Sequence, residues 1–140
     1  MDYRRFQDTL VVRIDRGEEI LQAVRSVAER ERIRLASVEA LGAVDDFTVG
    51  VYVLAEKKFC PNRFAGTYEI VSLTGTISTK DGEPNLHLHM SAGDGTGRVV
   101  GGHLAEARVS VTCEMVIRII DGTVDRQMDD AIGLNLWKFD

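Results

Sequence analysis

The sequence of 140 residues lacks any apolar run long enough to cross a membrane, and no apolar signal-peptide segment follows its first residues. It also has only two cysteines, Cys60 and Cys113, which are too few for a disulfide framework. We therefore expect a cytoplasmic protein that makes no contact with a membrane. We expect both thiols to be reduced, and neither to be a nucleophile.

Basic patches and nucleotide-binding loops are missing as well. The chain has 17 Lys and Arg against 22 Asp and Glu, a formal net charge of −5, and its densest basic group, residues 25–34, is interleaved with Glu29 and Glu31. Phosphate backbones are bound through clustered basic side chains, so we expect DNA binding by this chain alone to be weak or absent. The glycines of residues 93–97 are not followed by a helical pattern, which excludes a P-loop or dinucleotide fingerprint.

The remaining pattern predicts one domain over residues 1–140, of the α+β class, with a mainly antiparallel sheet and one principal helix. An acidic start at residues 15–18 precedes apolar residues at helical spacing, namely Ile20, Leu21, Val24, Val27 and Ala28. Short connections separate the apolar, β-branched segments, which favours antiparallel neighbours. The expected strands are residues 9–14, 36–43, 47–54, 68–78, a hairpin described next, and 109–120.

All three histidines, His87, His89 and His103, lie within 17 residues of one another. Apolar and polar residues alternate over residues 86–90, a glycine-rich turn follows, and residues 98–104 run back, which predicts a β-hairpin. With the loop centred on Gly95, His103 would lie opposite His87. One face of the hairpin would then be apolar and the other would carry the imidazoles.

Three imidazoles on adjacent strands can converge on one divalent transition metal and leave a coordination position open. Zinc suits His87, His89 and His103 best, although iron, nickel, copper and manganese fit the same ligands. The alternatives are a solvated polar face with incidental histidines, or histidines buried at a subunit contact. No catalytic residue can be named from the sequence.

One carboxylate is predicted near the histidines. If residues 106–107 form a two-residue turn, Ser110, Thr112 and Glu114 face the imidazole side. Glu114 could then hold an imidazole N–H or act as a general base on a metal-bound water. The interpretation we favour is a structural ion pair of Glu114 with Arg98 or Arg118.

Four segments resemble the plants and prokaryotes conserved (PPC, PD1-like) domain over essentially the whole chain. They are residues 66–78, residues 84–91 with the H-x-H pair, residues 101–104 reading G-G-H-L, and residues 111–117. The resemblance implies an α+β homotrimer with metal at the three histidines in free-standing members. It also implicates the segment around Glu69 in partner association, and it carries a DNA-binding label. The R-G-R-P hook through which plant members touch DNA does not occur here.

Two functions remain open. The first is a trimeric metal-binding module, regulatory or interacting, that works through protein partners or weakly through DNA. The alternative is a metal-dependent enzyme acting on a small molecule, with Glu114 or a neighbouring subunit handling protons. Direct DNA binding ranks last.

The residues themselves also predict the homotrimer, because apolar side chains occur on both faces of the long strands and one helix can cover only one face of the sheet. The aromatic C-terminal segment, residues 131–139, should dock on its own sheet or on a neighbouring subunit.

Overall fold

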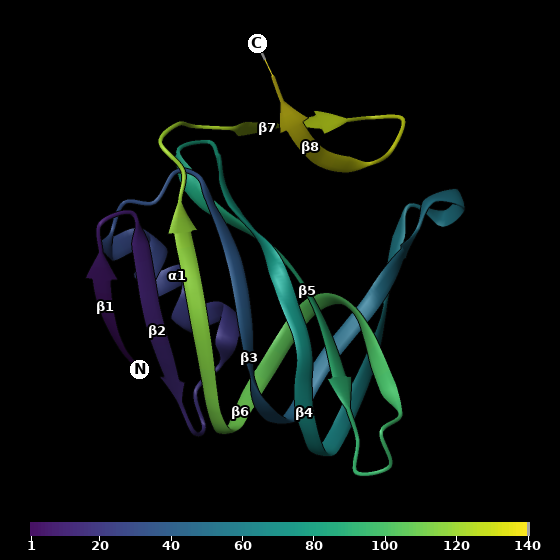
Figure 1. The fold of residues 1–140 in the computed structure, drawn as a ribbon. Helices are drawn as coiled ribbons and strands as arrows, with labels where there is room; N and C mark the ends of the chain where they lie inside the picture. The colour runs from purple at the N-terminus through teal and green to yellow at the C-terminus, as the bar shows by residue number, and fades with distance from the viewer. Residues whose placement is uncertain (140) are drawn as a thin grey trace.

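Six antiparallel strands form the main sheet of this protein in the computed structural model, which describes residues 1–139 (Figure 1). Their order is β1-β2-β6-β3-β4-β5, and β5 also pairs with β6, so that β3, β4, β5 and β6 close into a ring. The strands are β1 (Asp2–Phe6), β2 (Thr9–Asp15), β3 (Ala36–Val53), β4 (Lys58–Lys80), β5 (Glu83–Gly93) and β6 (Val99–Ile119). With one α-helix among the described residues, the predicted α+β class is confirmed.

The turns expected near residues 43–46 and at residues 106–107 are wrong, because β3 and β6 run through these positions as single long strands. The expected break near residues 43–46 is a bend within β3, with register shifts between Ala40 and Gly42 and between Val44 and Asp46. Extra residues of this kind bend a strand and increase its twist without ending it. Val44 and Phe47 on either side of the second shift are both fully buried, so the strand remains in the core as it bends.

The helix α1 (Ile20–Arg30) covers one face of the sheet, as its apolar spacing predicts (Figure 1). Its cap is Glu19, whose carboxylate accepts the N–H groups of Leu21 and Gln22 at 3.1 and 2.7 Å. The buried stripe consists of Ile20, Ala23, Val24, Val27 and Ala28. A short 3₁₀ turn, η1 (Leu54–Glu56), joins β3 to β4.

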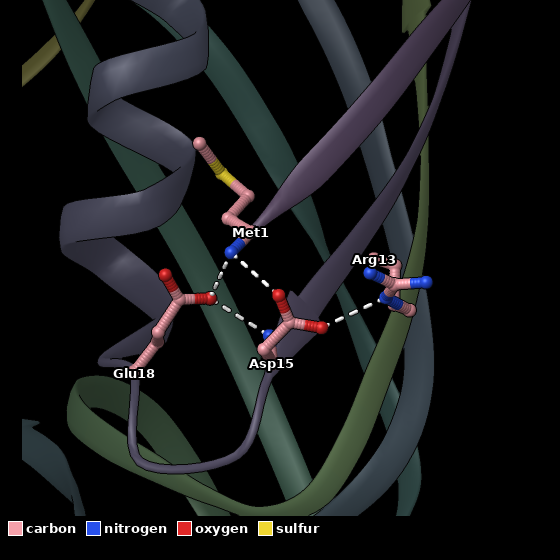
Figure 2. Close-up of polar contacts among 4 residues, drawn as sticks. All are labelled: Met1, Arg13, Asp15 and Glu18. Carbon is pink, nitrogen blue, oxygen red and sulfur yellow. Dashed lines mark hydrogen bonds and ion pairs between the residues drawn. The ribbon is translucent and has the colours of Figure 1, made fainter.

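The amino group of Met1 joins the start of β1 to the junction of β2 and α1 (Figure 2). It lies 2.8 Å from the carboxylate of Asp15 and 2.7 Å from that of Glu18, and Arg13 approaches Asp15 at 2.8 Å. The hydrogen bonds to the Met1 amine lower the pKa of both carboxyls below their ordinary values. The predicted acidic start at residues 15–18 therefore anchors the amino terminus, one residue before the helix cap.

The core lies between α1 and the sheet and continues inside the ring of strands. Phe47 stacks on Phe64 at a centroid distance of 5.4 Å and meets the edge of Tyr68 at 5.0 Å. Cys113 is buried and Cys60 half-buried, and both are free thiols. Burial raises the pKa of the Cys113 thiol to about 12, so it stays protonated and unreactive near neutral pH.

The C-terminal segment forms a separate hairpin, β7 (Asp125–Asp129) and β8 (Leu134–Lys138), which lies across one end of the sheet (Figure 1). It docks on its own chain, one of the two predicted locations. Tyr52 donates its hydroxyl to the carbonyl of Ile132 at 2.8 Å, and the N–H of Thr79 bonds to the carbonyl of Val124 at 3.0 Å. Over residues 1–139, no helix has both the length and the apolar character of a membrane span.

Candidate metal centre

The alternation of β5 separates apolar from imidazole side chains, as predicted. Leu88 and Met90 point into the core and are almost fully buried, while His87 and His89, which alternate with them, are exposed. The opposing strand β6 repeats the arrangement, because Leu104 is buried and His103 points outward and is half-buried. The three imidazoles therefore share the outer face of the sheet.

The predicted register of this hairpin is wrong by two residues. His103 pairs with His89 rather than His87, and the last pair is Gly93 with Val99. A shift by an even number of residues leaves every side chain on its original face, which is why the three histidines still meet.

The loop itself explains the shift, because Asp94 organises it. The carboxylate of Asp94 accepts the N–H groups of Thr96 at 2.8 Å and Arg98 at 3.1 Å, together with the hydroxyl of Thr96 at 2.6 Å. These bonds are typical of an Asx turn and hold a five-residue loop, residues 94–98, centred on Thr96 rather than Gly95. They also lower the pKa of Asp94, with the Thr96 hydroxyl making the largest contribution.

The three rings are nearly equidistant. Their centroids are 5.3 Å apart for His87 and His89, 5.2 Å for His87 and His103, and 5.5 Å for His89 and His103. One ligand nitrogen from each ring lies within 4.8 Å of the others. Nitrogens that share a tetrahedral zinc ion at about 2.1 Å lie about 3.4 Å apart, so small rotations of the side chains bring them onto one ion.

The electrostatics of the cluster favour neutral imidazoles, the form that binds metal. Loss of surrounding water lowers the pKa of His87, and the nearby His103, Arg126 and His89 lower it further. Desolvation, then the charge of His89, lowers the pKa of His103 in the same way. The donor set therefore fits a divalent transition metal.

Two features of neighbouring strands position His103. Phe59, near the start of β4, meets the ring of His103 edge-on at 5.5 Å. On the other side, Gly50 of β3 is the direct partner of His103. A Cβ at Gly102 would lie 2.5 Å from the carbonyl oxygen of Gly50, so a glycine here permits the close approach of β3 and β6.

The predicted placement of Glu114 beside the histidines is wrong. Residues 106–107 lie inside β6 and form no turn, so the strand continues past them. Glu114 therefore lies in the C-terminal half of β6, whereas His103 lies near its start. There its backbone partners are Arg13 of β2 and Leu41 of β3. Within residues 1–139 Glu114 forms no ion pair with Arg98 or Arg118, and Arg118 approaches Glu39 instead, at 3.9 Å.

Arg126 and Trp137 of the C-terminal hairpin also reach the site, and the sequence reasoning missed both. Together with residues 74–76 of β4, they line an open hollow of about 520 Å³ beside His87 and His89. No sequence periodicity connects residues 126 and 137 to the histidines. The one available signal was that Trp137 is the single tryptophan of the chain, in a segment expected to dock.

Long bent antiparallel strands, one covering helix and three outward-facing imidazoles define a small α+β protein with a three-histidine cluster. The profile of the Plants and Prokaryotes Conserved (PCC) domain matches residues 1–121, so the chain belongs to this family, as the sequence resemblance implied. A search of curated proteins finds no match.

Solved structures agree with this assignment over nearly the whole chain. A protein of Bacteroides thetaiotaomicron, named as a candidate DNA-binding protein, superposes with a TM-score of 0.96 at 26% identity, covering 99% of this chain and 96% of its own. A metal-containing protein of Archaeoglobus fulgidus gives 0.89 at 30% identity, with 99% and 97% covered. A PPC protein of Pyrococcus horikoshii gives 0.86 at 31%, with 99% and 94% covered.

Proposed function

We propose that this protein is a metal-binding module, regulatory or interacting, in which His87, His89 and His103 hold one divalent transition metal. The observation that carries the proposal is the convergence of three ligand nitrogens within 4.8 Å on one sheet face. The lowered pKa of two of the imidazoles and the metal-containing relative from Archaeoglobus fulgidus support it. Zinc is the ion we expect, because three neutral imidazoles suit it and a fourth position stays open for water or a ligand.

We further propose that the module is a cytoplasmic homotrimer that acts through protein partners. Apolar side chains remain exposed on the sheet, with Val71 at 60% and Val111 at 67% of full exposure. We expect these side chains to form a contiguous apolar surface in the trimer interface, since exposed apolar patches typically mark contacts with another chain. The remaining exposed aliphatic residues of the long strands are Val11, Leu41, Val51 and Val99.

Catalysis is the second candidate, favoured by the hollow beside the histidines. A metal-dependent hydrolytic enzyme needs a group that moves protons near the metal-bound water. Among residues 1–139, those that line the hollow include no carboxylate, and Glu114 lies elsewhere. We therefore place binding ahead of catalysis.

DNA binding, the label of the Bacteroides relative, ranks third. A net charge of −5 gives little counterion release on a phosphate backbone. Gel shifts at two salt concentrations should show no tight, sequence-selective complex with this chain alone.

A zinc titration tests the metal proposal. Protein stripped with a chelator should bind one zinc ion per chain in competition with a chromophoric chelator. The variant His103→Ala should bind zinc far more weakly while its circular dichroism stays unchanged, since the neighbouring apolar side chain, Leu104, is buried on the opposite face of the strand. Equal zinc affinity in the two proteins would overturn the proposal.

A further inference from the structure

Within residues 1–139, the lining of the hollow beside His87 and His89 is neutral or positive, although the chain as a whole is acidic. It is lined by residues 74–76 of β4, by His87 and His89, and by Arg126 and Trp137 with Leu136 of the hairpin. None of these residues is Asp or Glu, although the chain carries 22 of them. A bound dication would add further positive charge on the histidine side, so the hollow is suited to an anion.

Arg126 is the charged arginine that lines the hollow with the histidines, and within residues 1–139 part of its guanidinium has no hydrogen-bond partner. Its Nε donates to the hydroxyl of Ser78 at 2.9 Å and its Nη1 to the carbonyl of Asn135 at 2.9 Å. Over residues 1–139, Nη2 donates no hydrogen bond and Arg126 forms no ion pair with a carboxylate. The side chain is half-buried, and loss of water lowers its pKa. A fixed, partly desolvated guanidinium with donors to spare fits a planar anion such as a carboxylate.

Part of the lining is apolar and aromatic. Trp137 lies under the guanidinium of Arg126, whose carbon is 5.9 Å from the ring centroid. Leu136 lines the hollow beside it. The guanidinium of Arg126 and the ring of Trp137 form a cation–π contact. This contact fixes the position of the anion-binding group relative to the apolar surface.

We propose that this hollow binds a small organic carboxylate, held between the open metal position and Arg126, with its apolar body against Trp137. The inference rests on the proposed metal site and names the ligand class of that site. Arg126 and Trp137 lie outside residues 1–121, the part matched by the family profile. On this proposal, the C-terminal hairpin of this chain determines which ligand is preferred.

The test uses the full-length protein loaded with cobalt(II), whose visible absorption reports on the ligands of the ion. Acetate, benzoate and inorganic phosphate are titrated as probes, and the fluorescence of Trp137, the single tryptophan, is followed in parallel. Benzoate should change both signals and bind more tightly than acetate, because the ring adds contact with Trp137. Phosphate, which has no apolar body, should bind more weakly than benzoate.

Variants then locate the binding groups. Arg126→Gln should weaken benzoate about tenfold or more, the usual loss for a charge-assisted hydrogen bond, with cobalt content unchanged. Trp137→Leu should remove the preference for benzoate over acetate. The control Arg63→Gln removes an exposed arginine that pairs with Asp46 on the surface, and it should leave benzoate binding unchanged.

Arg126 also holds the hairpin, so Arg126→Lys provides a second variant that retains the charge without the planar fork. An unshifted tryptophan emission spectrum shows that the hairpin remains docked, and benzoate should then bind with intermediate affinity. If cobalt-loaded protein does not bind benzoate, or binds phosphate more tightly than benzoate, the inference is overturned while the proposed metal site is unaffected. Equal benzoate binding by wild type and both Arg126 variants overturns it as well. Wild-type protein that takes up no cobalt overturns the metal proposal itself, and this inference with it.

Discussion

His103 lies directly opposite His89 across β5 and β6, and their ring centroids are 5.5 Å apart. His87 lies two residues from His89 on the same strand and face, at 5.3 Å. The cluster is therefore built from two strands, and the pairing of those strands decides whether the third imidazole meets the other two. Residues that fix this pairing should affect metal binding without contacting the ion.

Phe59→Leu should weaken metal binding modestly. The Phe59 ring packs edge-on against His103, and an aromatic pair of this kind contributes about 0.5–1.5 kcal/mol. Zinc affinity should fall about two- to tenfold, measured by chelator competition. Phe6→Leu, at an exposed aromatic position outside the site, is the control and should bind zinc like the wild type.

Gly75→Ala should destabilise the sheet beneath the site. A Cβ at residue 75 would collide with the carbonyl oxygen of His87 and with Leu88, so β4 and β5 would have to separate. We expect a loss of about 1–3 kcal/mol in the free energy of unfolding, the usual cost of overpacking, and weaker zinc binding. Gly95→Ala, where a Cβ meets nothing within 4 Å, should change neither denaturant unfolding nor zinc affinity.

Asp94→Ala should lower the thermal midpoint more at neutral pH than at low pH. The pKa of Asp94 is lowered in the folded protein, so its stabilising contribution is full above the ordinary value of 3.8. That contribution falls as the pH drops below 3.8 and is lost below the lowered folded value. Melting curves at pH 7 and pH 2.5 should show a larger difference from wild type at pH 7. The control Asp121→Ala removes an exposed carboxylate without a side-chain hydrogen bond in the described chain, and should be neutral at both.

Local patterns were enough to predict much of the site. The alternation around His87 and His89 gave their shared face, because side-chain direction in a strand depends only on local backbone geometry. The stripe of α1 followed from helical spacing in the same way. Neither prediction needed knowledge of distant residues.

Longer-range features were not predictable in this way. The register was predicted with an error of two residues because the loop was centred on its glycines. In the structure, the hydrogen bonds of Asp94 determine where the loop is centred. The placement of Glu114 assumed a turn at residues 106–107, but Ala107 is buried opposite Phe47, which keeps β6 extended. Arg126 reaches the histidines only through tertiary docking of the hairpin, which leaves no periodic signal.

Val111→Asp should dissociate the proposed trimer. A carboxylate placed at this exposed apolar position would be desolvated in an interface, at a cost of several kcal/mol. Light scattering at low micromolar concentration should give three times the 15.5 kDa of the chain for wild type and a smaller mass for the variant. Arg16→Asp, at an exposed position outside the apolar set, should keep the wild-type mass. A monomeric wild type would contradict the trimer and leave the metal site untouched.

Elemental analysis of the purified protein tests the central claim most directly. Wild type should carry about one transition-metal ion per chain, with zinc the expected element. The variant with His87, His89 and His103 all replaced by Ala should carry none, while its circular dichroism shows the same fold. Equal metal content in the two proteins, or no metal in wild type after incubation with zinc, would contradict the account.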